Sequence, residues 1–312
     1  ASMEKELEPH ESGFYTIKKS EILNLKSEIY FVPTAEISCI YSRGGKVRRV
    51  HTVIVAPTLD VVKKINVRLR AIGNLHSDGR PILGLDVEEL TKIVFDASPN
   101  CLVIPAHAWT PWFAVFGSES GFDSLEECFG SMTKHIYAIE TGLSSDPKMN
   151  WRLSQLDRIT LLSNSDAHSL ANLGREANVF DIADTTQNVY AALTRIIREK
   201  DAKRFLYTIE FFPEEGKYHV DGHRACGVRL MPSETKKHGG RCPKCKKPVT
   251  VGVLYRIDAL ADRKEGEKPA NAISFKSMVP LQEIIAEAFG VGKQSKRVQE
   301  TYGSMVARGK SE

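Results

Sequence analysis

Three short apolar runs, each followed at once by polar residues, constrain the fold of this 312-residue chain more than any other feature. The runs and the strings after them are CLVI at 101–104 before Pro105-Ala106-His107, HIYAI at 135–139 before Glu140-Thr141-Gly142, and ITLLS at 159–163 before Asn164-Ser165-Asp166-Ala167-His168. Runs rich in β-branched residues and separated by helix-length stretches are typical of parallel strands buried on both faces. Because functional residues collect at the carboxyl ends of such strands, we predict an α/β barrel with a metal site at its mouth.

Two earlier segments add side chains to this set, since Glu36 lies near the end of an apolar run that starts at Ile29 and His51 heads the next run. The candidate ligands are Glu36, His51, His107, Asp166 and His168, with Glu140 as a weaker sixth. Nitrogen and carboxylate oxygen together suit zinc, manganese or iron, and five ligands can hold more than one ion. Paired ions are the usual device for hydrolysing a phosphoester. The alternative is that these histidines are hydrogen-bonded structural residues at strand ends.

A second set of ligands is defined more sharply by its spacing. His223-x-x-Cys226 is followed, after a gap of fifteen residues, by Cys242-Pro-Lys-Cys245. Two such pairs predict a tetrahedral structural zinc. The strings HRACG and CPKCK resemble two copies of one turn, which favours His223 over the nearby His219 as the fourth ligand. The alternative is that the cysteines are free surface thiols.

The charge of the chain is concentrated around the second cysteine pair. The net charge is +4, and residues 217–262 hold ten Lys or Arg against four Asp or Glu. Most of these cations cluster at Lys236, Lys237, Arg241, Lys244, Lys246 and Lys247. A basic zinc module beside a phosphoesterase-like site predicts a nucleic-acid backbone as partner, although a charge run is more often a solvated face. No run reaches eighteen apolar residues and the N-terminus has no signal-peptide pattern, so we predict a cytoplasmic protein outside the membrane.

The alternation of apolar runs and helical patterns divides the chain into four parts. We predict a lead segment at 1–26, the barrel domain at 27–212, a zinc module at 213–262, and a linker with a helical C-terminal segment at 263–312. RFLYTIEFF, which ends at Phe212, is the last strand expected before the zinc module. KEGEKPANA has the composition of a linker, and Pro280 opens a helix that Gly290 ends.

Many strings along the chain resemble one family of proteins. They are TAEIS, RVHTVIVAP, SDGRP, PAHAWTPWF, FDSLEEC, ETGLSSD, NSDAHS, LGREAN, KYHVDGHRAC, CPKCKKPVTVGVL and PANAISFKSMVPLQEIIAEAFGVG. Together they are similar to endonuclease Q, a DNA-repair nuclease family of the polymerase-and-histidinol-phosphatase (PHP) superfamily. The similarity runs from about residue 27 to residue 302 and includes the zinc module.

This resemblance implies a distorted (β/α)7 barrel that holds two or three divalent ions, which we expect to be Zn2+, Mn2+ or Mg2+. It implies that Glu36 bridges two ions, that His51 and His107 ligate one of them, and that Asp166 and His168 form the final D-x-H motif. Glu36, Asp166 and His168 are therefore expected to be catalytic. The family nicks DNA 5′ to deaminated bases such as uracil and hypoxanthine, and at abasic sites. Trp109, Trp112 and Phe113, beside His107, are candidates for stacking on a base, and equally for core packing.

One departure from the family is the absence of an H-x-H motif among the nine histidines. PHP proteins place that motif on their first strand, so the barrel is expected to be incomplete at its N-terminus. Two explanations compete: the sequence is a fragment of a longer nuclease, or it is a shortened protein that lost part of its metal cluster. The fragment is favoured because the other ligands are intact as a set, and it leaves the activity of this polypeptide by itself an open question.

Two other classes of function compete with a nuclease. The first is a non-catalytic DNA-binding protein with a degenerate PHP barrel and a working basic zinc module. The second, less favoured, is a small-molecule phosphatase of the PHP superfamily. A small phosphate ester needs no extended cationic surface, which argues against that phosphatase.

Overall fold

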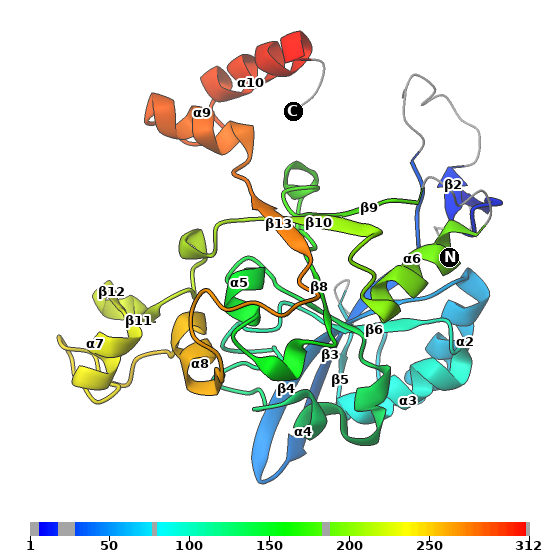
Figure 1. Ribbon diagram of the computed structural model, residues 1–312, viewed down its shortest axis with the longest axis horizontal. Helices are drawn as coiled ribbons and strands as arrows, with labels where there is room; N and C mark the ends of the chain where they lie inside the picture. The colour runs from blue at the N-terminus through cyan, green and yellow to red at the C-terminus, as the bar shows by residue number, and fades with distance from the viewer. Residues whose placement is uncertain (1–5, 18–28, 77–79, 183–187, 310–312) are drawn as a thin grey trace.

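The computed structural model describes residues 6–17, 29–76, 80–182 and 188–309. Figure 1 shows a mixed α/β body with the helices α9 and α10 at one end and a small β-containing module at another. The α-helices are α2 (Leu59–Arg70), α3 (Val87–Ala97), α4 (Leu125–Phe129), α5 (Pro147–Asn150), α6 (Val189–Glu199), α7 (Pro232–Lys237), α8 (Val253–Leu260), α9 (Leu281–Phe289) and α10 (Lys296–Gly309). Short 3-10 helices are η1 (Gly130–His135), η2 (Ser154–Leu156), η3 (Leu170–Asn172), η4 (Pro213–Glu215) and η5 (Arg224–Cys226).

The largest sheet has the strand order β5-β3-β4-β6. Its strands are β3 (Thr34–Arg43), β4 (Lys46–Val55), β5 (Ile82–Leu83) and β6 (Leu102–Pro105). β3 and β4 form an antiparallel hairpin in which Glu36 pairs with Val53 and Ser38 with His51. β5 runs parallel to β3, and β6 runs antiparallel to β4.

The predicted alternation of parallel strands and helices is therefore wrong for this part of the chain. Gly44 and Gly45 join β3 to β4 with φ of 62° and 71°, and two consecutive positive φ angles form the tight turn of a hairpin. Glu36 lies near the start of its strand and His51 lies inside the next one, so neither side chain follows the carboxyl end of a parallel strand. Of the three apolar runs, only the second and third pair with each other in parallel.

The remaining strands form four small sheets. They are β7 (Ala138–Glu140) with β8 (Thr160–Leu162), β10 (Phe205–Glu210) between β13 (Ser274–Ser277) and β9 (Ala177–Phe180), β11 (Asp221–His223) with β12 (Val228–Leu230), and β1 (Leu7–Pro9) with β2 (Tyr15–Ile17). Within the described ranges these sheets stay separate and close no barrel, so the predicted (β/α)7 barrel is not confirmed.

Two helices of the body begin at polar N-cap residues of the kinds that favour a helix start. Thr58 caps α2 by accepting a hydrogen bond from Val61 N–H, and Asp86 caps α3 through Glu88 N–H. The buried faces of α2 and α3 pack with β3 and β4 in the main hydrophobic core. The predicted helix after Pro280 is confirmed as α9, which ends at Gly290 with φ of 63°. In the described residues, no helix is both long and apolar enough to cross a membrane.

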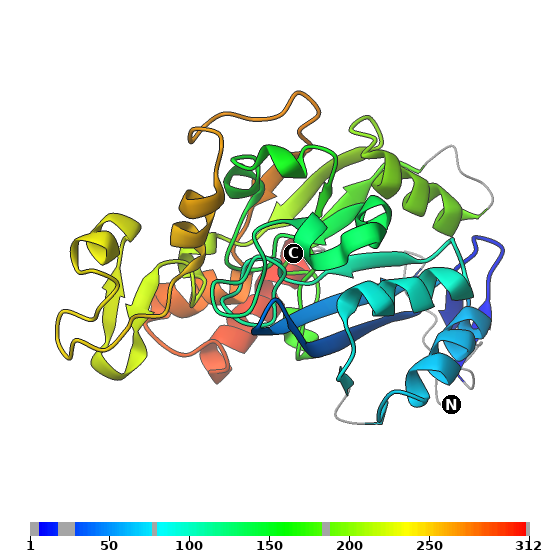
Figure 2. The ribbon, with the colours of Figure 1, turned by 90° about the horizontal axis from the view of Figure 1, so that it is seen from below.

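The zinc module and the segment after it both contact the body. The module is built around a small core that contains Val228, Leu230 and Val249. Val253 and Ile257 of α8 are buried in the main core, and α8 lies between the module and the body in Figures 1 and 2. Beyond the predicted linker, β13 returns to the body and pairs in parallel with β10. The rest of the module is therefore held against the body through α8, the last helix of the predicted module, which contacts α5 of the body and α7 and β11 of the module.

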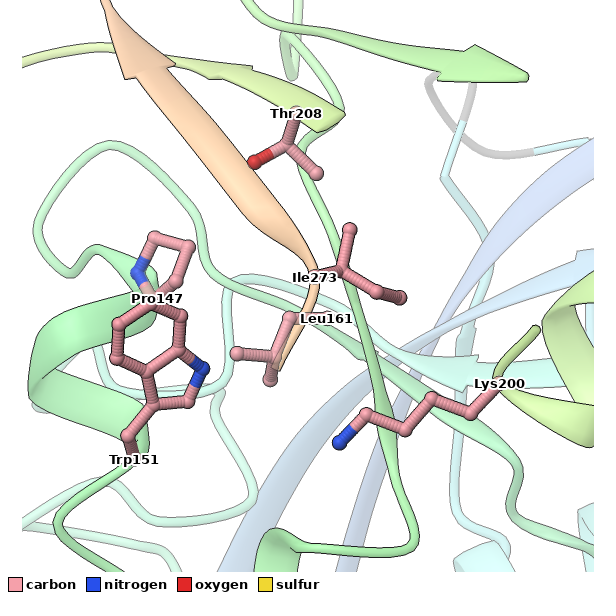
Figure 3. A pocket seen from close by; sticks show the side chains of 6 residues that line it. All are labelled: Pro147, Trp151, Leu161, Lys200, Thr208 and Ile273. Carbon is pink, nitrogen blue, oxygen red and sulfur yellow. The ribbon is translucent and has the colours of Figure 1, made fainter. Parts of the chain in front are cut away.

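A buried lysine anchors the same returning segment. Lys200 is 8% exposed, and its Nζ donates to the backbone oxygen of Asp157 at 2.8 Å. Burial lowers the pKa of Lys200 to about 8. Figure 3 shows its side chain pointing into a small pocket, toward Leu161 and Ile273. Because Asp157 also pairs with Arg263, this contact joins α6 to the connection that leads into β13.

Strand β10 supports the end of β7 through a buried carboxyl group. Glu210 is fully buried, and burial raises its pKa to about 7. Its side chain accepts hydrogen bonds from the hydroxyls of Thr141 at 2.8 Å and Thr208 at 2.6 Å. Ser163, directly after β8, donates to the backbone oxygen of Ile209 at 2.6 Å. These contacts fix the carboxyl ends of β7 and β8 against β10, next to the polar residues that follow both strands.

Candidate metal centre

Three of the predicted ligands come together above the β3–β4 hairpin. Each of Glu36, His51 and His107 offers a ligand atom, and these atoms lie within 4.8 Å of one another. His51 Nδ1 is 2.8 Å from Glu36 Oε1, and His107 Nε2 is 3.1 Å from His51 Nδ1 and 3.5 Å from Glu36 Oε1. Two imidazole nitrogens and one carboxylate converging in this way suit zinc or manganese.

The electrostatics of this trio centre on the carboxylate of Glu36. Burial alone would raise the pKa of Glu36, but its contacts with His107 and His51 outweigh burial and hold that pKa well below the usual range. Burial lowers the pKa of His51, so its imidazole is held neutral. Burial opposes a charge on His107 too, yet the hydrogen bond to Glu36 raises its pKa. Glu36 therefore offers an ionised carboxylate and His51 a neutral imidazole, whereas His107, whose pKa is raised, must lose its proton before it can bind a metal.

The backbone of His107 is held in an uncommon conformation. Its φ is 30°, in the left-handed region that few residues other than glycine adopt. Its N–H donates at 3.0 Å to the buried carboxylate of Glu140, whose other oxygen accepts from Asn164 at 2.7 Å. A Cβ on Gly142 would lie 2.9 Å from both Cα and Cβ of His107, so only glycine fits there. Glu140 thus orients a ligand in this structure instead of joining the trio.

Asp166 and His168 lie apart from the trio but face the same cleft. They follow β8, and Asp166 Oδ1 is 3.4 Å from His168 Nε2. The cleft has a volume of about 660 Å³, and His51, His107, Asp166 and His168 all line it. The side chain of His168 is 75% exposed. The structure therefore brings three of the five predicted ligands together and places the other two on the wall of their cleft.

The aromatic candidates beside His107 separate into two kinds. Trp109 is 1% exposed, stacks on Phe116 and donates to Asn150 at 2.8 Å, so it is a core residue. Trp112 and Phe113 line the cleft. Phe113 lies against His51 with ring centroids 4.6 Å apart, and Trp112 meets Tyr218 edge to face at 5.9 Å.

The second set of predicted ligands meets in the zinc module. Each of His223, Cys226, Cys242 and Cys245 offers a ligand atom, all within 4.8 Å of one another. The residues that follow the two pairs, Gly227 and Lys246, both have positive φ, 59° and 64°. The two pairs therefore lie in similar turns, and the donor set of three sulfurs and one nitrogen suits a tetrahedral zinc.

Comparisons with known proteins identify the family. No family model matches the chain. It is 30% identical over 241 residues to the uncharacterized protein MJ0043 of Methanocaldococcus jannaschii and 32% identical over 263 residues to the uncharacterized protein YqxK of Bacillus subtilis. These matches cover 76% and 83% of this chain, and the chain spans 29% and 62% of those relatives, less than two thirds of each.

Two solved structures are similar over nearly the whole chain. The lesion-specific endonuclease PfuEndoQ of Pyrococcus furiosus superposes with a TM-score of 0.80 at 28% identity, covering 99% of this chain and 71% of that one. Endonuclease Q in complex with a 27-mer duplex carrying an abasic lesion at the active site gives 0.81 at 30% identity, covering 99% and 72%. This chain belongs to the endonuclease Q family. The resemblance found in the sequence is thereby confirmed.

Two residues that shape the cleft, Arg80 and Asn164, are not among the predicted ligands. Arg80 contacts both oxygens of Glu36 at 3.1 Å, and Asn164 holds Glu140. Arg80 lies in the string SDGRP, one of the strings that resemble the family, but arginine has no lone pair for a metal, so a pattern of metal ligands does not include it. The part of that string at 77–79 lies outside the described residues.

We predict that Gly142→Ala weakens divalent-metal binding by the trio about tenfold or more, because the added Cβ must displace His107. The measurement is a competition titration with Mn2+ and a fluorescent chelator. Gly44→Ala is the matched control: Gly44 has nearly the same positive φ, 62°, but its Cβ would meet nothing within 4 Å. Equal losses in the two variants would assign the effect to backbone strain alone and contradict the role given to the close approach.

We predict that His223→Gln releases zinc from the zinc module and that His219→Gln does not. His219 is buried and lies outside the four-residue ligand group. The two variants are compared by zinc content after dialysis against a chelator, where the parent should retain about one zinc ion per chain. Loss of zinc in the His219 variant alone would show that His219, not His223, is the fourth ligand. Retention of zinc in both variants would show that neither histidine is needed as a ligand.

Proposed function

We propose that this chain carries the active centre of a metal-dependent DNA-repair endonuclease that hydrolyses the phosphodiester 5′ to a deaminated base or an abasic site. The observation that carries the proposal is the similarity over 99% of the chain to endonuclease Q bound to duplex DNA with an abasic lesion at the active site. The trio of Glu36, His51 and His107, open to a cleft, supports hydrolysis at this place.

In this proposal the trio holds a divalent ion, Zn2+, Mn2+ or Mg2+, and Asp166 and His168 supply ligands for a further ion from the cleft wall. A bound ion of this kind neutralises charge on the phosphate and lowers the pKa of water. Glu36 provides the negative charge that retains the ion. Glu140 orients His107, and Glu210, through Thr141, holds the end of the strand that carries Glu140.

The cleft walls suit a nucleotide that has left the base stack. Trp112, Phe113 and Tyr218 present aromatic rings at the cleft, where a base can stack. Trp109 is excluded from that role because it is buried in the core. The proposed lesions are uracil, hypoxanthine and abasic sites, which differ only in the base. The aromatic side chains of the cleft wall are therefore the residues expected to contact the part of the nucleotide that varies.

We predict that the chain with Mn2+ nicks a duplex containing one uracil, one hypoxanthine or one abasic site, and leaves the undamaged duplex intact. Glu36→Gln should reduce the rate about 100-fold or more, because it removes the charge that retains the ion. Glu119→Gln, the same chemical change at an exposed glutamate, should keep the parent rate. Denaturing gels of end-labelled strands give the position and rate of nicking.

The same assay decides between the competing functions. Binding of the damaged duplex without metal-dependent nicking would favour the non-catalytic DNA-binding protein. Hydrolysis of p-nitrophenyl phosphate with no nicking of DNA would favour the small-molecule phosphatase. Either outcome contradicts the proposed endonuclease activity of this chain.

A second cleft extends the first toward the zinc module. Its volume is about 590 Å³, and it shares Trp112, Lys217 and Tyr218 with the metal cleft. Beyond these residues it is lined by Arg224 and Arg229, which are both exposed. Cations that continue from the metal cleft suit the backbone of a strand whose lesion lies at the trio. We therefore place the DNA path along this second cleft, and not on the outer lysines of the module.

We predict that Arg224→Gln with Arg229→Gln lowers the affinity for damaged duplex about tenfold and reduces the slope of log K against log salt by about 2. The matched control, Lys237→Gln with Lys247→Gln, removes the same charge from exposed positions that do not line the cleft. Fluorescence anisotropy across a salt series measures both quantities. Equal effects of the two pairs would show that only net charge matters and would contradict this path.

A further inference from the structure

Arg80 stands beside the metal trio without being able to ligate a metal. Its Nη1 lies 3.1 Å from Oε1 and 3.1 Å from Oε2 of Glu36, so one guanidinium nitrogen spans the whole carboxylate. Glu36 Oε1 also accepts from His51 at 2.8 Å. The side chain of Arg80 is 35% exposed and lines the same cleft as His51 and His107. Arg80 is therefore in contact with both the ligand and the solvent of the cleft.

This contact places two cations in competition for one carboxylate. A divalent ion held by the trio needs lone pairs of Glu36, and both oxygens of that residue already contact Arg80. Two positive charges a few ångströms apart in a partly buried site repel each other strongly. The repulsion persists because a guanidinium is a permanent cation. The ion and Arg80 therefore compete for Glu36, and binding of the ion favours a position of the guanidinium away from that carboxylate.

The cleft offers Arg80 one other class of partner. Of the described side chains that line it, Arg80 and Lys217 carry permanent positive charge, and only Arg80 reaches the trio. A planar guanidinium matches the oxygens of a phosphate in the same two-point way that it matches a carboxylate. An arginine released from Glu36 is thus already next to the place where a phosphodiester meets the trio.

We propose that Arg80 exchanges Glu36 for the substrate phosphate: it pairs with the carboxylate in the free protein and binds the phosphodiester in the metal- and DNA-bound state. This inference rests on the proposed function for its second half, since the phosphodiester is the proposed substrate. The exchange couples binding of the metal ion to binding of the DNA. The metal ion displaces the guanidinium from Glu36, and the phosphodiester then accepts hydrogen bonds from it.

The proposal requires two effects of opposite sign. We predict that Arg80→Met binds Mn2+ about tenfold more tightly than the parent, because the competing cation is gone. With Mn2+ at saturation, the same variant should nick abasic DNA about 100-fold more slowly, because the phosphate has lost its guanidinium. Arg80→Lys keeps the charge but not the two-point geometry, so both effects should be smaller. Chelator-competition titration gives the first quantity and single-turnover gel assays give the second.

Lys217→Met is the matched control, since it removes one positive charge from the same cleft at a residue whose amine lies over the Tyr218 ring, away from Glu36. It should leave Mn2+ affinity unchanged. Mn2+ affinity that is unchanged or weaker in Arg80→Met overturns the proposal, as does tighter binding with an undiminished nicking rate. If the parent nicks no DNA, the endonuclease proposal fails, and the Mn2+ titration still decides whether Arg80 competes for Glu36.

Discussion

The hydrogen bond between His107 N–H and the buried carboxylate of Glu140 is the contact on which the candidate metal centre depends. It joins the end of β6 to the end of β7, two strands that share no ladder, at a residue with a positive φ. A buried carboxylate without partners would be costly, and here both oxygens are used, one by His107 and one by Asn164. The polar residues after three separate strands are thereby held as one unit, and His107 is aimed at Glu36.

The two predicted metal sites differ in how much of them could be found in the sequence. The predicted zinc ligands lie in two turns of four residues each, so their spacing in the sequence is enough to predict that the four side chains meet. The residues of the trio lie in β3, in β4 and just after β6. The sequence predicts all three as ligands, but it does not predict the antiparallel hairpin that brings Glu36 and His51 together. The alternation of strands and helices farther along the chain predicts parallel strands here too, whereas Gly44 and Gly45 form the turn of an antiparallel hairpin.

Other parts of the cleft leave no linear pattern. The fit of Gly142 against His107 depends on a close approach between two chain segments, which no local pattern reports. Arg80 is visible in the sequence only as part of a string shared with the family. β13, which pairs with β10, follows directly after a stretch whose composition predicts a linker, and no pattern in the sequence indicates its partner. Such features come from long-range packing, and their residue types are ordinary when taken alone.

The distribution of charge connects the proposals to one another. Carboxylates are concentrated at the trio and behind it, where Glu36 and Glu140 are partly or fully buried. Permanent cations begin at Arg80 and continue outward through Lys217 to Arg224 and Arg229 along the two joined clefts. In the proposed function, the inner negative zone retains metal ions and the outer positive zone retains the DNA backbone. Arg80 lies on the boundary and contacts the negative zone, so an exchange of partners there is the step by which occupation of one zone can prepare the other.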